Sequence, residues 1–582
     1  MASRLGIIYF GVQRGVAGKC GDCFVPVSHE NFLVALGICR HSCWRRVELC
    51  SHRGIHVGCA ASGRMNIMYL ETAIKSEQSF LGSAVLYLRP HATGVFLALV
   101  FLMAIPFRLQ DIREPSGILL VDREYRAALI ARAYYFETAD SIPEWRKGVA
   151  RVSKEREGPL EPPIIELLVS SVYRAVNGEH LWVARVVSSG FWLIGGVFLY
   201  LIARKIASVE AALLATAYYL FVPLGIRASR SFQPDTLMIM MYLFSLWMIL
   251  RHSDRPLRTR LLTAAAVTGL TLLVRPLVLF TLIGAFLSLA IYREGVRRTI
   301  TSTHCWLFVI LSFVPVAAYY GGYGVVAGFL HWKVETSFMP HLFWTQVYWR
   351  EWLLLAASEV GYTPLLAALI GLSLVSGGIP KALLAGLWIG YFVFGLVFNF
   401  HIHTHGYYQL QLIPIVALSW GPIVTSLVRQ LKRVCTPWYR WIPVTGALLL
   451  IFLFNALEVR NGLAHASFES IGVLREVGNI VNHSTRTLYV ARFYGRPLEY
   501  YGELSGLPWP QRITQGLYRR PGERELTIEE RFNALGFSPE YFIITDFNQL
   551  DRYHPDMKEF LRDHCPVVAQ SKDYLIYGAC AR

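Results

Sequence analysis

The chain has 582 residues, enough for several average soluble domains. Its composition excludes that organisation, since 54% of the residues are hydrophobic and 16% are charged, whereas an ordinary globular protein is about 25% charged. So few charged side chains cannot cover a water-exposed surface, and the composition therefore predicts a protein embedded in lipid. The same values exclude a disordered chain, a coiled coil and collagen.

Apolar runs near membrane length recur from residue 93 onward and predict an α-helical polytopic membrane protein with about eleven spans. The expected spans are 93–107, 182–203, 208–227, 235–250, 261–275, 277–292, 303–322, 361–377, 383–399, 409–427 and 441–458. The run 163–176 is short and carries Glu166 and Arg174, so it predicts an amphipathic helix at the membrane interface.

The net charge of +16 fits two classes of protein, nucleic-acid binders and membrane proteins with basic cytoplasmic loops. The positions of the basic residues favour the second class. With the first span running outward, the inner loops hold fourteen Lys and Arg residues, and the short outer loops hold only Arg227, Arg230 and Arg275. This asymmetry predicts a multi-pass protein of the plasma (inner) membrane with a cytoplasmic N-terminus, and no nucleic-acid partner.

The predicted topology divides the chain into three parts. Residues 1–92 are expected to be a poorly ordered cytoplasmic extension, and 93–458 form the transmembrane domain, with 108–181 as a large first outer loop. Loops of this length in compact proteins are typically functional. The tail 459–582 alternates strand-like and polar helical segments, which predicts a small extracytoplasmic α/β domain. The expected strands are 487–492, 541–546 and 574–579.

Six of the ten cysteines lie in the N-terminal extension, at Cys20, Cys23, Cys39, Cys43, Cys50 and Cys59. The spacings in CGDC and CRHSC are compatible with zinc, but they match no zinc finger well. We favour an upstream extension without a folded role, with Met65 or Met68 as the truer start. The extension also lacks the apolar segment of a secretory signal.

The first candidate site lies just after the first span. Asp122, Arg123, Glu124 and Arg126 introduce a stretch with helical periodicity. Carboxylates at a membrane edge are costly and are functional candidates, although acidic residues in a first turn are also typical of an ordinary helix start.

The same outer loop continues to a double proline. Pro162 and Pro163 fix the start of the predicted interfacial helix and hold Glu161 just before it. The loop therefore presents a further carboxylate beside the membrane.

The second candidate site combines cations with a carboxylate. Arg227, Arg230 and Arg275 oppose the orientation bias, which indicates a role other than topology. Together with Arg123 and Arg126, they are candidates for binding the donor phosphate, while Asp235 accepts a proton or orients the acceptor. Alternatively, Asp235 is a simple helix-start residue after Pro234.

The third candidate site is the segment that contains His403, His405, Tyr407 and Tyr408. The two histidines alternate like metal ligands on a strand, but no carboxylate or Cys lies beside them. We therefore favour a surface that binds a sugar or a lipid phosphate, because aromatic rings offer apolar faces to saccharides. No cofactor is firmly implied, and a divalent metal is the less favoured alternative.

Four motifs in this order resemble the GT-C glycosyltransferases: DREYRAALIAR, EPPIIELL, SRSFQPD and HTHGYYQLQLIP. The resemblance extends over roughly 93–458. It is closest to the protein mannosyltransferase and aminoarabinose transferase group (glycosyltransferase family 39), which includes the bacterial Rgt-type sugar transferases. It implies an inverting hexosyl- or pentosyltransferase that takes a sugar from a polyprenyl-phosphate carrier.

The resemblance also implies site residues. The acid of the first outer loop falls on Asp122 or Glu124, and the acid of the second falls on Asp235. Arg123 interrupts the Asp-Glu pair that is typical of the first loop, which leaves the identity of the catalytic base open.

A second departure concerns the donor phosphate. The family's Lys-Pro-Pro is Glu161-Pro162-Pro163 in this chain. A cation expected near the lipid phosphate is therefore missing, and Arg230 or Arg275 is expected to replace it.

The residues themselves support the same chemistry. A sugar phosphodiester becomes a competent donor once cations neutralise its phosphate, and a carboxylate must accept the proton of the acceptor hydroxyl. We therefore predict extracytoplasmic sugar transfer from a polyprenyl-phosphate lipid, within the membrane, to a protein, lipid or glycan of the cell envelope.

Two other functions remain as alternatives. A transporter or flippase of lipid-linked saccharides typically shows internal repeats, and we find none in the sequence. A receptor whose tail binds a partner is the other alternative.

Overall fold

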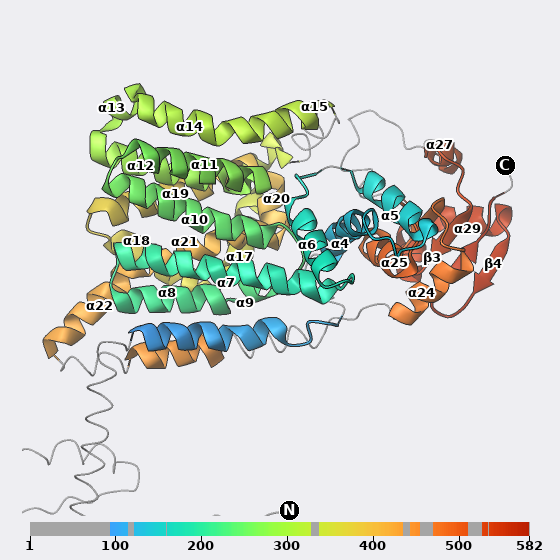
Figure 1. The fold of residues 1–582 in the computed structure, drawn as a ribbon, viewed down its shortest axis with the longest axis horizontal. Helices are drawn as coiled ribbons and strands as arrows, with labels where there is room; N and C mark the ends of the chain where they lie inside the picture. The colour runs from blue at the N-terminus through green and yellow to red at the C-terminus, as the bar shows by residue number, and fades with distance from the viewer. Residues whose placement is uncertain are drawn as a thin grey trace, which may run out of the picture. The chain divides into compact units, whose positions relative to one another are not determined.

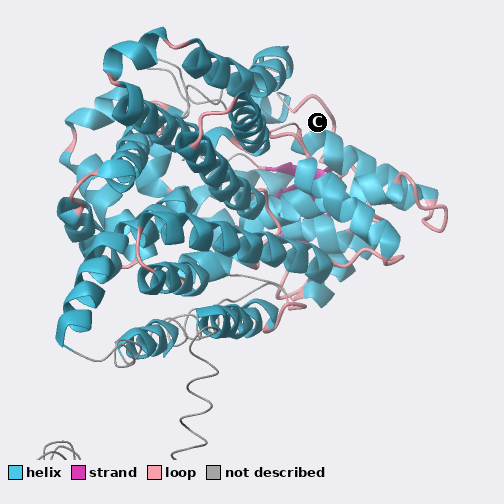
Figure 2. Cartoon of the chain, turned by 60° about the vertical axis from the view of Figure 1, so that its left-hand side comes forward, coloured by secondary structure: helices cyan, strands magenta, loops and turns pink. Residues whose placement is uncertain are grey.

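The computed structural model describes residues 93–114, 121–158, 160–326, 337–434, 443–453, 470–509, 527–533 and 535–580. The expectations for residues 1–92, including the cysteine spacings, lie outside these residues. Within them, the chain is mainly helical and the strands gather near the C-terminus (Figure 2).

The helices that precede the C-terminal domain appear in Figure 1. In chain order they are Thr93–Leu109, α4 (Val121–Phe136), α5 (Glu144–Glu157), α6 (Ile164–Ala175), α7 (Leu181–Ile206), α8 (Val209–Phe221), α9 (Pro223–Ser229), α10 (Asp235–Asp254), α11 (Arg258–Val274), η1 (Pro276–Val278), α12 (Leu279–Glu294), α13 (Val296–Thr301), α14 (Thr303–Val316), η2 (Ala317–Tyr323), α15 (Gly324–Val326), η3 (Pro340–Trp344), α17 (Gln346–Val360), α18 (Tyr362–Leu374), α19 (Gly378–Val397), α20 (Asn399–Thr404), η4 (Gly406–Gln411), α21 (Leu412–Ser419), α22 (Gly421–Val434) and Pro443–Leu453.

Six helical segments among the described residues are long and apolar enough to cross a membrane, and two bent pairs raise this number to eight. The pairs are α8 with α9, bent by 57°, and α17 with α18, bent by 102°. Each of the eleven predicted spans falls on a described helix, but several of these helices are short, so the count of eleven stays a prediction.

Both bends have a local cause. Pro223 opens α9, and a proline disfavours helical backbone at the residue before it, so Val222 has ψ 132°. Between α17 and α18, Gly361 has φ 89°, a conformation that L-residues rarely adopt.

The helices α10 and α11 form an antiparallel hairpin joined by a three-residue turn. Inside it, the hydroxyls of Ser245 and Thr271 lie 2.8 Å apart, and Thr271 also donates to the carbonyl of Met241. Because the hairpin is antiparallel, the first residue of α10 lies beside the residue that ends α11.

The predicted first outer loop folds into the helices α4, α5 and α6. The helix α6 is the amphipathic segment expected at 163–176, with Glu166 in its first turn and Arg174 in its last. Its burial follows one face, since Ile165, Val169 and Tyr173 are buried while Leu167 and Leu168 are exposed.

The C-terminal domain contains the expected α/β structure. In order, its elements are α24 (Ile471–Ile480), β1 (Thr487–Val490), η5 (Arg492–Gly495), α25 (Arg496–Gly502), β2 (Gly506–Pro508), α27 (Ile528–Asn533), β3 (Tyr541–Ile544), α28 (Phe547–Tyr553), α29 (Pro555–His564), β4 (Val567–Gln570) and β5 (Leu575–Tyr577). The three predicted strands are β1, β3 and β5, whereas the short β2 and the largely exposed β4 were not expected.

The sheet has the order β2-β1-β3-β5-β4. The strands β1, β2 and β3 are parallel, and β5 runs antiparallel to both β3 and β4. All four residues of β1 are buried, because the sheet is covered on both faces. Tyr489 packs with α24 and α25, and Leu488 packs with α28 and α29.

The C-terminal domain contacts the outer-loop helices through polar pairs. The hydroxyls of Tyr125 and Tyr501 lie 3.0 Å apart, and Arg132 donates to the Tyr500 carbonyl at 2.7 Å. Arg146 and Glu503 form an ion pair. The helix α4 is thus held from the side of the sheet domain as well as by the long helices.

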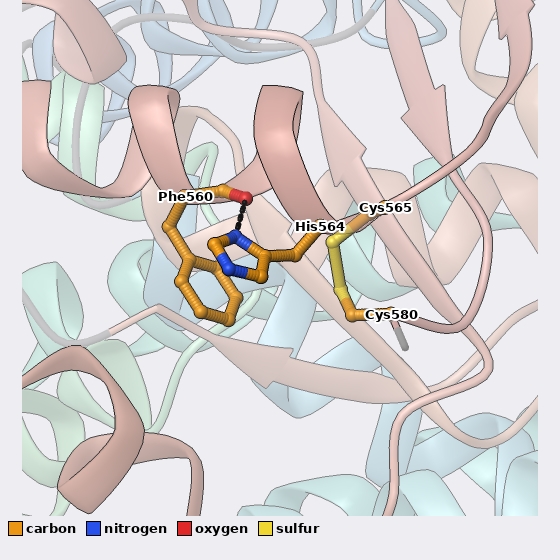
Figure 3. Close-up of a disulfide and its surroundings, with 4 residues drawn as sticks. All are labelled: Phe560, His564, Cys565 and Cys580. Carbon is orange, nitrogen blue, oxygen red and sulfur yellow. Dashed lines mark hydrogen bonds between the residues drawn. A yellow bond between two sulfur atoms is a disulfide. The ribbon is translucent and has the colours of Figure 1, made fainter. Parts of the chain in front are cut away.

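A disulfide joins Cys565, at the end of α29, to Cys580, after β5 (Figure 3). Beside it, the His564 ring stacks on Phe560 with centroids 4.6 Å apart. The bond closes the segment that carries the two antiparallel strands.

Replacement of Cys565 and Cys580 by Ser is expected to lower the free energy of unfolding of the C-terminal domain by about 3 kcal/mol. The bond joins residues that are 15 positions apart, and closing a loop of that length restricts the unfolded chain. Pulse proteolysis of the purified chain in urea measures the change. The control is Cys305→Ser, which removes a free thiol from α14. An unchanged urea midpoint in the double variant contradicts the expectation.

Candidate active site

The α10–α11 hairpin brings a carboxylate and a guanidinium together. Asp235 is the first residue of α10, and Arg275 is the first residue after α11. They form an ion pair in which the side chain of Arg275 is 4% exposed and that of Asp235 is fully buried. Two residues forty positions apart are thus joined by the geometry of one hairpin.

Two residues of the outer loop complete a charged cluster around this pair. Glu161 lies 3.3 Å from Nε of Arg275 and 3.3 Å from Nη2 of Arg123. Arg123 belongs to the first turn of α4, and Glu161 precedes α6. We call Arg123, Glu161, Asp235 and Arg275 the ion-pair cluster.

The ring of Tyr407 lies against both arginines of the cluster. Its centroid is 5.2 Å from Cζ of Arg123 and 5.5 Å from Cζ of Arg275. The segment η4 carries this tyrosine and is fixed by Gln411, which accepts a hydrogen bond from Thr281 at 3.2 Å. The site thereby contains one aromatic ring that contacts two cations.

The ion-pair cluster is electrically balanced, with two guanidiniums and two carboxylates. Balance matters because burying an unpaired charge is costly. The pairing is nevertheless incomplete, since Nη1 of Arg123 is buried without a hydrogen-bond partner in the described chain. A guanidinium with an unused, buried donor is suited to bind an oxygen of an anionic ligand.

The two predicted acids of the first loop lie elsewhere. Asp122 is 3.4 Å from Arg496 of the C-terminal domain. Glu124 is fully buried and accepts two hydrogen bonds from Arg185, at 2.8 and 3.0 Å, and one from the backbone N–H of Phe232. It is Arg123, between them, that joins the ion-pair cluster.

Three predicted phosphate-binding arginines also lie outside the cluster. Arg126 contacts Glu157 and donates to the Gly158 carbonyl at 2.6 Å. Arg227 pairs with Glu359 at 2.7 Å. Arg230 donates to the Gln110 carbonyl. Their positions follow from their helices, because α9 directs Arg227 towards α17.

The histidine segment makes mostly local contacts. Nδ1 of His403 lies 2.7 Å from the Asn399 carbonyl, and Nδ1 of His405 lies 2.7 Å from the Thr404 hydroxyl. Tyr408 is buried against the ring of His401. Among the described residues, no group of three or more His, Cys, Asp or Glu is arranged to hold a metal ion.

A cleft of about 690 Å³ adjoins the ion-pair cluster. Glu161 belongs to both, and Pro163 also lines the cleft. The neighbouring proline turn is tight, since the N–H of Ile164 donates to the Pro162 carbonyl at 2.7 Å. The double proline therefore fixes Glu161 at the boundary between cleft and cluster.

Glu166 lines the cleft but was not among the predicted site residues. Glu166 is 5% exposed. Burial raises the pKa of its carboxyl to about 7, although the positive charge of Arg126 acts to lower it. The available signal was a carboxylate three residues after Pro163 inside an apolar helix, which we interpreted as a mark of the membrane interface.

Comparison with known proteins supports the fold. Residues 160–320 match the sequence model of the family described as dolichyl-phosphate-mannose-protein mannosyltransferase. This match runs from just before α6 into η2. No curated protein sequence matches the chain.

Two solved structures are similar. ArnT from Cupriavidus metallidurans bound to undecaprenyl phosphate has a TM-score of 0.52 and 15% identity, over 84% of this chain and 98% of ArnT. An oligosaccharyltransferase from Archaeoglobus fulgidus tethered to an acceptor peptide has a TM-score of 0.49 and 12% identity, over 78% and 69% of the respective chains. The family match and the ArnT likeness confirm the GT-C resemblance, with a helical membrane fold and a small C-terminal sheet domain.

Replacement of Glu124 by Gln is expected to destabilise the folded chain by about 3–5 kcal/mol, because Arg185 keeps a buried charge without its carboxylate. Thermal unfolding of the purified protein in detergent measures the loss.

The matched control for this experiment is Glu137→Gln. Glu137 follows α4 and pairs with Lys154 on the surface, where an ion pair contributes about 0–1 kcal/mol. Equal melting temperatures for the two variants contradict a stabilising role for the Glu124–Arg185 pair.

Proposed function

We propose that this chain, which has the fold of the GT-C glycosyltransferases, transfers a sugar from a polyprenyl-phosphate-linked lipid to an acceptor hydroxyl on the extracytoplasmic face. The observation that carries the proposal is the ion-pair cluster: the buried guanidinium of Arg275 and the partly buried guanidinium of Arg123 lie 5.5 and 5.2 Å from the Tyr407 ring centroid, and one buried donor of Arg123 is unused. The ArnT structure, which contains undecaprenyl phosphate, supports a lipid phosphate as the ligand.

The two arginines supply what the leaving group needs. Departure of a sugar from its phosphate places negative charge on the bridging oxygen, and fixed cations stabilise that charge in the transition state. Arg123 and Arg275 come from separate elements, α4 and the end of α11, so they can contact two oxygens of one phosphate. They replace the cation that is missing from the Glu161-Pro162-Pro163 motif.

Asp235 and Glu161 keep these cations in place. Arg275 contacts both carboxylates, so its guanidinium is held from two sides. An anionic ligand that approaches Arg123 and Arg275 competes with carboxylates already present. The site therefore favours a dianionic or strongly accepting group such as a phosphate over a weak hydrogen-bond acceptor.

The proposed reaction inverts the anomeric carbon. The acceptor hydroxyl attacks from the side opposite the phosphate, and an outer-loop carboxylate takes its proton. Glu161 lines the open cleft and also belongs to the ion-pair cluster, so the cleft lies beside the two arginines. Phosphate and acceptor can therefore approach the sugar from different directions.

Two features support an extracytoplasmic orientation of the site. The disulfide of the C-terminal domain fits an oxidising compartment. The basic residues of the short loops gather at the other ends of the helices, as the positive-inside rule requires for cytoplasmic loops.

Substitution of Asp235 by Asn is expected to abolish sugar transfer, with a loss of at least about 10²-fold, because Arg275 is then held by Glu161 alone and its guanidinium is no longer fixed from two sides. Mass spectrometry of cell-envelope glycans, with and without the substitution, measures the effect.

Asp254→Asn is the matched control. Asp254 ends the same helix and pairs with Lys205, far from the cluster along α10. The account requires that both variants insert in the membrane at wild-type levels and that the Asp254 variant keeps its glycans. Wild-type glycans in the Asp235 variant rule out the proposed role of this carboxylate.

A further inference from the structure

Glu166 is the buried carboxylate of the cleft beside the ion-pair cluster. The double proline ends one residue before α6 begins, and this places Glu166 in the first helical turn, on the buried side with Ile165. Its side chain lines the same cleft as Glu161. The cleft thus leads from the cation site to a second carboxylate.

The other carboxylates near the site are committed to arginines. Glu124 accepts a two-point contact from Arg185, and Asp235 is paired with Arg275. Both carboxylates therefore already have a guanidinium partner.

Three further acids are held in the same way. Glu157 is bound by Arg496 at 2.6 Å, and Arg496 also contacts Asp122. Glu161 lies between two arginines of the ion-pair cluster. Among the described carboxylates that line the cleft, Glu155 and Glu166 form no ion pair within 4 Å, and Glu155 is exposed.

The surroundings of Glu166 are suited to proton transfer near neutral pH. Burial raises the pKa of its carboxyl to about 7, where a general base is most efficient. Charged and titratable side chains face it from α4, from α5, from the loop before α6 and from η2. They are Arg123, Arg126, Tyr134, Lys154, Glu155, Glu161, Tyr319 and Tyr323.

Aromatic rings form much of the remaining wall. Tyr134 comes from α4, and Tyr319 and Tyr323 come from η2, with the last two centroids 5.7 Å apart. Such rings offer apolar faces to a saccharide. The segment η2 is a π-helix, a feature that frequently occurs at functional sites.

We infer that the cleft holds the acceptor hydroxyl group and that Glu166 is its general base. The inference rests on the proposed sugar transfer and names the acid that this transfer requires. The acceptor O–H bond breaks and its proton passes to the Glu166 carboxylate, while the acceptor oxygen forms a bond to the anomeric carbon. The bond between that carbon and the phosphate oxygen breaks, and its electron pair leaves with the polyprenyl phosphate.

The test compares wild-type full-length protein with Glu166→Gln in a detergent extract of source membranes, which supplies donor and acceptor lipids. Release of free polyprenyl phosphate, measured by mass spectrometry, reports turnover for any acceptor. We expect the variant to lose about 10²- to 10⁴-fold in kcat. The wild-type rate is expected to fall as pH drops below about 7, because the base becomes protonated.

Two variants separate catalysis from folding. Glu144→Gln removes an exposed carboxylate from the first residue of α5, outside the cleft, and is expected to keep the wild-type rate and pH profile. Glu166→Asp keeps a carboxylate on a side chain that is one methylene shorter. This variant is expected to retain partial turnover, and the pH at which its rate falls on the acidic side is expected to differ from that of the wild type. If Glu166 has a purely structural role, these substitutions do not change the pH at which the rate falls on the acidic side.

The outcomes distinguish this inference from the function on which it rests. If the wild-type protein turns over and Glu166→Gln has the same rate and the same loss of rate at low pH, Glu166 is not the base. The proposed transferase function then still stands. Absence of phosphate release by the wild-type protein overturns both. A Glu166→Gln variant that is folded but inactive, beside an active Glu144→Gln, supports the inference.

Discussion

The structure depends on one constraint: a guanidinium buried among helices must be paired. Arg275 ends α11 at a buried position, and the antiparallel hairpin supplies Asp235 as its partner. The outer loop adds Glu161 and, with it, Arg123. The pairing therefore ties the long helices to the first outer loop. It also leaves one buried donor of Arg123 unused, and this makes the same contacts suitable for a ligand.

Acidic residues divide into two groups around this site. Glu124 and Glu157 bind arginines on neighbouring elements, and they hold α4 between α7 and the C-terminal domain. Glu166 instead lines an open cleft without an ion-pair partner within 4 Å among the described residues. The acids of the first group bind arginines, whereas burial raises the pKa of Glu166 to about 7, which favours proton exchange near neutral pH.

Much of the fold could be predicted, because long apolar runs indicate helices in lipid and alternating apolar and polar residues indicate strands. The adjacency of Asp235 and Arg275 could also be predicted from the short hairpin between two spans. The choice of Arg123 over Asp122 and Glu124 could not be predicted, since one step along a helix rotates the side chain by about 100°. β4 was missed because its residues are mostly exposed and lack a buried alternation.

Ligand binding shows whether Arg123 and Arg275 hold the phosphate of a lipid carrier. Native mass spectrometry of the purified chain with undecaprenyl phosphate compares the wild-type protein with Arg275→Gln and Arg260→Gln, two arginines at opposite ends of α11. If Arg275 binds the phosphate, the wild-type protein and the Arg260 variant retain the lipid phosphate and the Arg275 variant loses it. Equal retention by all three proteins excludes this role of Arg275.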